Sequence, residues 1–78
     1  MVTPEYVRDL IAQGIECEHL KVDGDGAHFE AVIVSRLFAG KSRVARHQLV
    51  NQALGAQMGN EIHALSMKTL TPDEWQGV

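Results

Sequence analysis

Apolar side chains recur along the chain with two different periods, and each change of period marks a new element. Near the amino terminus the spacing is helical, with apolar positions at Tyr6, Val7, Leu10 and Ile11. Thr3 can cap a helix, Pro4 suits the first helical position, and Gly14 is a typical terminator. The pattern therefore predicts a helix that begins after Thr3 and ends at Gly14.

The next two segments have the pattern of β-strands joined by a tight turn. Residues 15–22 interleave apolar and charged side chains, and residues 28–35 contain three consecutive β-branched residues, 32–34. Between them, residues 23–26 read Asp-Gly-Asp-Gly, which is a strong turn signal. We therefore expect an antiparallel hairpin. The β-branched run favours a central strand that is partly covered on both faces.

A second helical segment follows a short loop. Ser42 can cap a helix that starts at Arg43, and we expect it to end at residues 59–60. Gly55 lies inside this segment and lowers helix stability by about 1 kcal/mol relative to Ala, which favours a break near residues 51–55. The expected apolar stripe consists of Val44, Val50, Leu54 and Met58.

The chain closes with a third strand and a short capped turn. Residues 62–70 have the pattern of a strand, and Thr71, Pro72 and Glu74 form the signature of a capping box with proline at the first helical position. A helical crossover places the third strand parallel to one hairpin strand. The order predicts an α+β two-layer αββααβ sandwich with a three-stranded mixed sheet and helices on one face.

Length and composition narrow the class of protein. The chain has 78 residues, of which 45% are hydrophobic and 22% charged, so we expect one small globular domain over residues 1–78. The longest apolar run covers only residues 31–34, whereas a membrane span needs about 20 residues. We expect neither a membrane span nor a signal peptide.

Charge and cysteine content exclude further classes. Seven Lys and Arg oppose ten Asp and Glu, for a net charge of −3, so nucleic-acid binding would need a local basic patch. The single cysteine, Cys17, excludes an intramolecular disulfide and fits the reducing cytoplasm. Its neighbours Glu16 and Glu18 raise the pKa of a thiol, so we interpret Cys17 as a small core or edge residue.

Three separate stretches resemble the BolA family. They are Phe38-x-Gly40-x-Ser42-Arg43, Ile62-His63-Ala64-Leu65 and Thr71-Pro72-x-Glu74-Trp75. The Gly-Asp-Gly-Ala-His-Phe turn is similar to the IbaG branch of the family, whereas His47 is similar to the BolA branch. The resemblance implies a fold like class II KH domains. It also implies that the protein is a cytosolic partner of monothiol glutaredoxins and shares a 2Fe–2S cluster with them. Members of the family are additionally described as DNA-binding transcriptional regulators linked to stress.

The resemblance also implies which residues bind the cluster. A histidine such as His63, near apolar neighbours, is more often structural, but it matches the histidine that ligates the shared cluster in the family. His28 taken alone is an exposed loop residue, and it matches the variable second ligand. The partner's cysteine and a glutathione would complete the coordination. We therefore expect no cluster in the isolated protein.

The other histidines and the basic residues have plainer interpretations. His47 falls on the apolar side of its helix and is expected to be partly buried and structural. His19 is expected to be exposed and without a role. Lys41, Arg43 and Arg46 cluster at one helix start and could bind a nucleic-acid phosphate, which is the basis of an alternative function as a DNA-binding transcriptional regulator.

Two further motifs are incomplete. Gly40-Lys41-Ser42 opens a helix, but Ser35 stands where a phosphate loop needs glycine, and Arg43 interrupts the Gly-x-x-Gly loop of RNA-binding KH domains.

No nucleophile–base pair is evident, so we do not expect an enzyme. The first hypothesis is an adaptor for a monothiol glutaredoxin, the second a DNA-binding protein, and the third a small structural dimer. We expect a monomer or weak homodimer, with Trp75 packed back on the domain.

Overall fold

The fold alternates helices with a hairpin and one crossover strand. The computed structural model describes residues 2–57, 62 and 64–77. The elements in this part of the chain are α1 (Pro4–Gly14), β1 (His19–Gly24), β2 (Phe29–Val34), the 3₁₀ turn η1 (Arg36–Phe38), α2 (Arg43–Leu54), the 3₁₀ turn η2 (Gly55–Gln57), β3 (Leu65–Leu70) and α3 (Pro72–Gln76). This order is the expected one.

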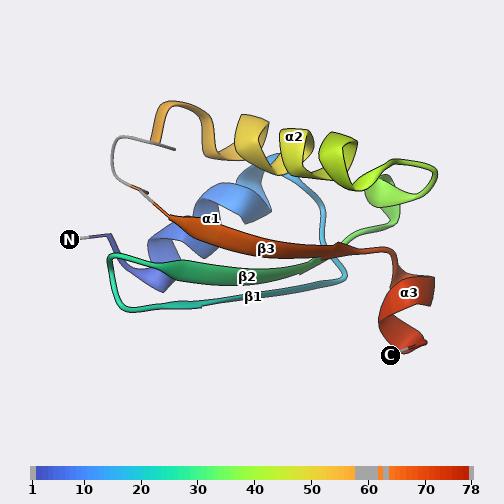
Figure 1. Cartoon of the computed structure of the whole chain (residues 1–78), viewed down its shortest axis with the longest axis horizontal. Coiled ribbons are helices and arrows are strands. Elements are labelled where there is room, and N and C mark those ends of the chain that lie inside the picture. The colour runs from blue at the N-terminus through green and yellow to red at the C-terminus, as the bar shows by residue number, and fades with distance from the viewer. Residues whose placement is uncertain (1, 58–61, 63, 78) are drawn as a thin grey trace.

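The three strands form one mixed sheet in the order β1-β2-β3 (Figure 1). The hairpin pair is antiparallel, with His19 opposite Val34. The pair β2–β3 is parallel, with Phe29 opposite Leu65, because α2 carries the chain back along the sheet before β3 begins. Both features confirm the predicted topology, and they place β2 at the centre.

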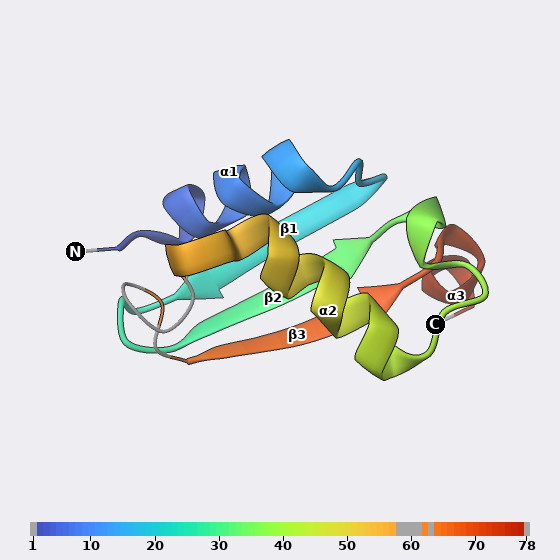
Figure 2. The same cartoon turned by 90° about the horizontal axis from the view of Figure 1, so that it is seen from above.

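Helices α1 and α2 lie side by side on one face of the sheet (Figures 1 and 2). Alternate residues of β2 point toward them, so Phe29 and Ile33 are almost fully buried. The helices complete this core with buried Ile11 and Val50. The other buried members of the core are Val7, Ile15, Ala31, Phe38, Leu54 and Ile62. The two-layer sandwich predicted from the sequence is therefore confirmed.

The opposite face of the sheet is open except at the carboxyl ends of β2 and β3, where α3 lies (Figure 1). Trp75 of α3 stacks on His19 of β1, with ring centroids 4.7 Å apart and an interplanar angle of 18°. Val34, paired with His19 and Leu70 on this face, is fully buried. Trp75 does pack back on the domain, but 41% of its surface remains exposed.

Side-chain caps define the helix starts. The hydroxyl of Ser42 accepts a hydrogen bond from the Ala45 N–H at 3.2 Å, as predicted for the start of α2. Thr71 accepts from the Glu74 N–H at 3.2 Å, and the Glu74 carboxylate accepts from the Thr71 N–H at 2.8 Å. These two bonds form the predicted capping box and fix the direction in which α3 leaves the sheet.

The predicted strands were too long at their amino-terminal ends. Strand β1 begins at His19 rather than residue 15, because Ile15 is the C-cap of α1 and is buried against the helices. Strand β3 begins at Leu65 rather than residue 62, and Ile62 forms an isolated bridge. Ser35 falls outside β2 because its hydroxyl caps η1.

The predicted stripe of α2 was wrong at its first position. Val44 is 66% exposed, whereas Val50 and Leu54 are buried. At about 3.6 residues per turn, Val44 is rotated roughly 120° from Val50 around the helix, so it points away from the sheet. The expected break is confirmed, because α2 ends at Leu54 and η2 follows. Met58 and the predicted end at residues 59–60 lie outside the described residues.

Candidate functional site

The hairpin turn presents His28 at one end of the sheet. The carboxylate of Asp25 accepts hydrogen bonds from the N–H of His28 at 2.9 Å and of Ala27 at 3.0 Å. These two N–H groups, His28 first, lower the pKa of Asp25 below its usual range. The turn is closed by a bond from the Asp25 N–H to the His28 carbonyl at 3.1 Å. The side chain of His28 is exposed.

Glycine is required in this turn at two positions. A Cβ on Gly24 would lie 2.5 Å from the His28 carbonyl oxygen and from the Phe29 ring, which is too close for any side chain. Gly26 has a φ of 98°, a conformation that other residues rarely adopt. The Asp-Gly-Asp-Gly sequence therefore allows the chain to turn tightly and leaves His28 at the start of β2.

The turn lies beside the point at which β3 enters the sheet. The N–H of Phe29, the residue after His28, donates to the Ala64 carbonyl at 2.9 Å, and Phe29 pairs with Leu65. His63, the other ligand implied by the resemblance, lies outside the described residues. Its sequence neighbour Ala64 and the exposed His28 thus both belong to the hairpin end of the sheet.

Metal binding at this end would depend on donors from another molecule. No group of three or more His, Cys, Asp or Glu side chains with metal-binding geometry occurs in the described ranges. A 2Fe–2S cluster takes four protein or thiol ligands. His28 and His63 together could supply at most two of them.

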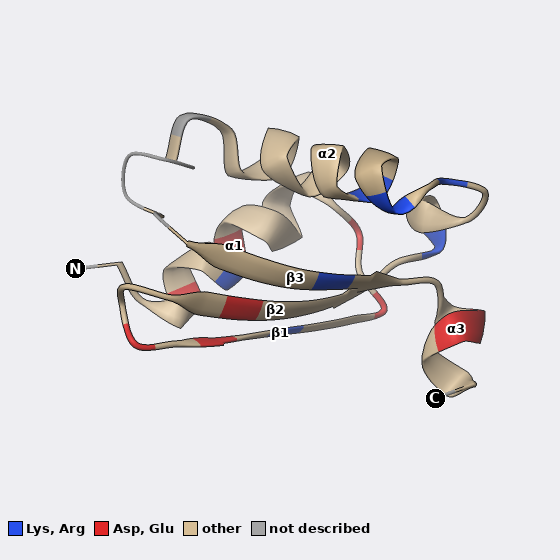
Figure 3. Cartoon of the chain, viewed as in Figure 1, with Lys and Arg blue, Asp and Glu red and all other residues tan. Residues whose placement is uncertain are grey.

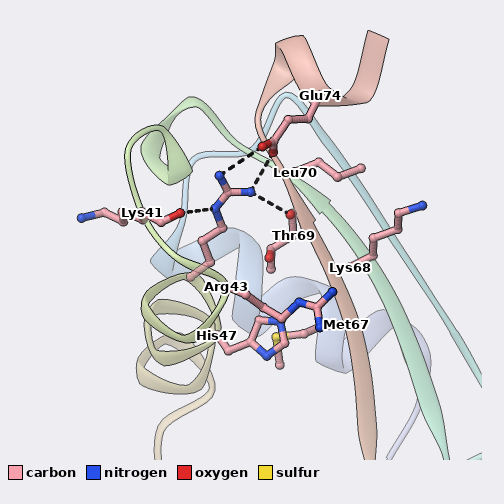
Figure 4. A pocket seen from close by; sticks show the side chains of 9 residues that line it. Lys41, Arg43, His47, Met67, Lys68, Thr69, Leu70 and Glu74 are labelled. Atoms are coloured by element: carbon pink, nitrogen blue, oxygen red, sulfur yellow. Dashed lines mark hydrogen bonds and ion pairs between the residues drawn. The ribbon is translucent and has the colours of Figure 1, made fainter. Parts of the chain in front are cut away.

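The basic residues lie at the opposite end of the sheet, and Arg46 is bound within the chain. Dashed lines in Figure 4 mark its bonds to Lys41, Thr69 and Glu74. Its guanidinium donates to the Glu74 carboxylate at 2.7 Å, to the Thr69 carbonyl at 3.1 Å and to the Lys41 carbonyl at 3.0 Å. The side chain is 13% exposed. The bond from Arg46, assisted by the Thr71 N–H, lowers the pKa of Glu74 to about 2.

The other two basic residues considered above, Lys41 and Arg43, line a groove of about 680 Å³ between α2 and β3. Lys41 and Arg43 are exposed there, and Lys68 of β3 is a third exposed cation. Figure 3 shows these blue segments at the start of α2 and on β3, while acidic residues mark the hairpin turn and the strands β1 and β2. His47 also lines the groove and is half-buried, as predicted.

Sequence reasoning missed three features of this end. His19 is half-buried and stacked on Trp75, so the expectation that it is exposed and without a role was wrong. The Arg46–Glu74 pair joins residues 28 positions apart, and only the path of α2 over β3 brings them together. Lys68 carries no local signal, because its membership of the groove depends on the same long-range packing.

Cys17 is a packing residue, as expected. It is half-buried against the core, and its thiol donates to the Ile15 carbonyl at 3.4 Å. Burial, followed by the charge of Glu18, raises the pKa of this thiol. It is therefore protonated at neutral pH and poorly suited to redox or metal chemistry.

Known proteins share both the sequence pattern and this fold. The profile of BolA-like proteins matches residues 11–74. Human BolA-like protein 2 is 37% identical, covering 95% of this chain and 91% of its own length. The Vibrio cholerae DNA-binding transcriptional regulator BolA is 51% identical over 68% of this chain, which spans half the length of that protein.

A solved structure of a BolA homologue from Coxiella burnetii superposes with a TM-score of 0.88 at 44% identity, covering 97% of this chain and 99% of that one. Yeast Fra2 superposes with a TM-score of 0.79 at 36% identity, covering 99% and 87%. Within the described part of the chain, no helix is long and apolar enough to cross a membrane. The matched profile and these relatives establish that the chain belongs to the BolA family.

Proposed function

We propose that the chain is a cytoplasmic adaptor that binds a monothiol glutaredoxin around a shared 2Fe–2S cluster, with His28 and His63 as its own ligands. The observation that carries this proposal is the exposed His28 beside the entry of β3, where the sequence continues back to His63. His28 and Ala64, the sequence neighbour of His63, both lie at this end of the sheet. The basic groove and α3 lie at the other end, so His28 and the groove can act independently.

The donor set fits half of such a cluster. Imidazole is a good ligand for iron, and replacing thiolates by histidine raises the reduction potential of a 2Fe–2S centre. When bound, the cluster would supply a one-electron redox centre. This chain would offer two imidazoles, while the partner's cysteine and a glutathione would supply the thiolates. The requirement for both sources makes cluster binding depend on complex formation.

The names of relatives support the physiological setting of this proposal. A relative from Escherichia coli is called acid stress protein IbaG and is 37% identical over 88% of this chain. A BolA domain also occurs in Arabidopsis SufE1, which superposes with a TM-score of 0.80. The name IbaG supports a role in the response to stress, and a role in iron–sulfur or iron homeostasis follows from the cluster that we propose.

Co-purification with a monothiol glutaredoxin under anaerobic conditions, with glutathione and iron supplied, tests the proposal. We expect a complex with the visible absorption of a mixed-ligand 2Fe–2S cluster and no such absorption from the isolated chain. His47→Gln is a matched control, because His47 lies at the groove, away from the hairpin turn. A complex of wild-type protein that forms without a cluster, or a cluster spectrum identical in the double variant His28→Ala/His63→Ala, would overturn the proposal.

DNA binding is the alternative, supported by the name of the Vibrio relative and by the cations of the groove. Because Arg46 is bound to Glu74, only Lys41 and Arg43 of the three residues first considered are available to bind phosphates. Real DNA binding must weaken steeply as salt rises, in proportion to the number of phosphates contacted. A titration of duplex DNA at several salt concentrations therefore separates this function from the adaptor function.

A further inference from the structure

Strand β3 is an edge strand whose outer backbone groups can be assigned. The N–H of Phe29 donates to the Ala64 carbonyl, and the N–H of Ser35 donates to the Leu70 carbonyl. In a parallel pair the bonds alternate along each strand, so the even-numbered residues of β3 bond to β2. The residues whose backbone groups point outward are Leu65, Met67 and Thr69.

One outward group already has a partner. The Thr69 carbonyl accepts a hydrogen bond from Arg46 at 3.1 Å, which confirms the direction of the odd-numbered residues. This bond closes the edge next to α3. Across the described ranges, no other hydrogen bond reaches the outward backbone groups of Leu65 or Met67. Among the residues that the structure describes, the open edge therefore runs from Leu65 to Arg46.

The groove between α2 and β3 follows this edge. Its lining includes four consecutive residues of β3, residues 67–70. Side chains of successive strand residues point to opposite faces, so a cavity lined by all four runs along the backbone edge that they share. The cavity thus gives a ligand access to the outward backbone groups of Met67.

Positive charge lies on both sides of the open edge. Met67 packs against the core, so its neighbour Lys68 points to the open face of the sheet. Lys41 and Arg43 stand on the other side, at the start of α2 (Figure 4). The one acidic residue of the lining, Glu74, is paired with Arg46. Three exposed cations therefore face any chain that lies along β3.

We propose that this edge binds an extended, acidic peptide segment of a partner protein as a fourth strand of the sheet. The open edge offers N–H donors and carbonyl acceptors at the spacing of an extended peptide. Alternate side chains of the bound strand would point toward Arg43 and toward Lys68, so acidic residues at neighbouring positions would both find cations. The cations of this site lie at the end of the sheet opposite His28, and the proposal does not depend on the proposed function.

Two other occupants are less compatible with the groove. A second copy of β3 would bring Lys68 and Arg43 close to the same cations of its partner, which is unfavourable. A nucleic-acid strand would place phosphates near the outward Met67 carbonyl, and the net charge of −3 opposes it. A peptide supplies both the hydrogen-bonding groups and the negative charge.

Amide hydrogen exchange with a synthetic peptide tests the proposal. The six residues of β3 span about 20 Å, so the probe is a capped, labelled peptide of about that length, Val-Glu-Glu-Val-Glu-Glu-Val. We expect binding to slow exchange at the outward Leu65 and Met67 amides but to leave the Ser66 and Lys68 amides, already bonded to β2, unchanged. An N-methylated peptide of the same charge should bind at least about tenfold more weakly, because it cannot pair with the edge.

Charge variants separate this site from general attraction. Arg43→Glu with Lys68→Glu should weaken peptide binding at least about tenfold. Lys21→Glu on the other edge strand, β1, changes the net charge in the same direction and should leave binding nearly unchanged. Equal binding of the N-methylated peptide, or no protection at Leu65 and Met67, would overturn the proposal. Tighter binding of a single-stranded oligo-dT at these amides, or concentration-dependent self-association there, would assign the edge to nucleic acid or to a second copy instead.

Discussion

The two ends of the sheet are held in different ways. At the α3 end, side chains from distant segments bind one another, as in the Arg46–Glu74 pair and the His19–Trp75 stack. At the hairpin end, the turn is closed by backbone groups and by the Asp25 carboxylate. The side chain of His28 is exposed there. The difference indicates that side chains at the α3 end stabilise the fold, whereas the imidazole of His28 is available for binding.

The strongest test of this comparison changes the backbone of the hairpin end. Gly24→Ala places a Cβ 2.5 Å from the His28 carbonyl and the Phe29 ring, so we expect a loss of roughly 3 kcal/mol in the free energy of unfolding. Gly77→Ala at the α3 end meets no atom closer than 3.5 Å and should be nearly neutral. Urea denaturation of both variants measures the effect. Similar midpoints for the two would show that the turn adapts to a side chain.

The next largest effect is expected at Arg46. Arg46→Met keeps much of the apolar stem but removes the bonds to the carbonyls of Thr69 and Lys41, and we expect a loss of about 2 kcal/mol. Arg43→Met, at an exposed position of the same helix, should change stability by no more than about 0.5 kcal/mol. Chemical denaturation can compare the two. An equal effect of both substitutions would mean that the internal bonds of Arg46 contribute nothing.

Trp75, at the same end of the sheet, is expected to contribute less to the free energy of unfolding than Arg46. Complete burial would make Trp75→Ala cost about 3–5 kcal/mol, but 41% exposure lowers the expectation to about 1–2 kcal/mol. A double-mutant cycle with His19→Ala should give a coupling energy of about 0.5–1.5 kcal/mol for the stacked pair. A coupling of zero, measured by thermal or urea unfolding, would show that the two rings stabilise the protein independently.

The smallest effect is a pH dependence at Glu74. The pKa of this carboxyl falls from its ordinary 4.5 to about 2 in the folded protein, so its contribution to stability is complete above pH 4.5. As pH falls from 4.5 toward 2, that contribution is lost. The stability difference between the wild type and Glu74→Gln should therefore shrink over this window. A difference that stays constant down to pH 2 would contradict the assigned pairing with Arg46.

Local signals in the sequence predicted most of the fold. The caps at Thr3, Ser42 and Thr71 and the turn at residues 23–26 place the elements, because each depends on neighbouring residues only. The parallel β2–β3 pair also follows, since a helical crossover permits few alternatives. The true start of β1 at His19 did not follow, because the alternation of residues 15–18 is compatible with a strand and only packing makes Ile15 a helix cap.

The functional residues were predictable to a different degree at the two ends. The exposure of His28 follows from the Gly-rich turn beside it, so a local signal sufficed. The engagement of Arg46 and the position of Lys68 depend on how α2 lies over β3, which no local pattern encodes. The sequence therefore grouped Arg46 with the exposed cations and omitted Lys68. In the structure, Arg46 is bound within the chain and Lys68 is one of the exposed cations of the groove.

The most direct test of the adaptor proposal is the rate at which the glutaredoxin complex loses its cluster to a chelator. We predict that His63→Ala accelerates this loss more than His28→Ala, because His28 follows an exposed turn where water or another donor can replace it. Neither substitution should remove the fold, which circular dichroism of the isolated variants would check. A His63→Ala complex that keeps the wild-type visible spectrum and the wild-type rate of loss would contradict the proposal that this chain ligates the cluster.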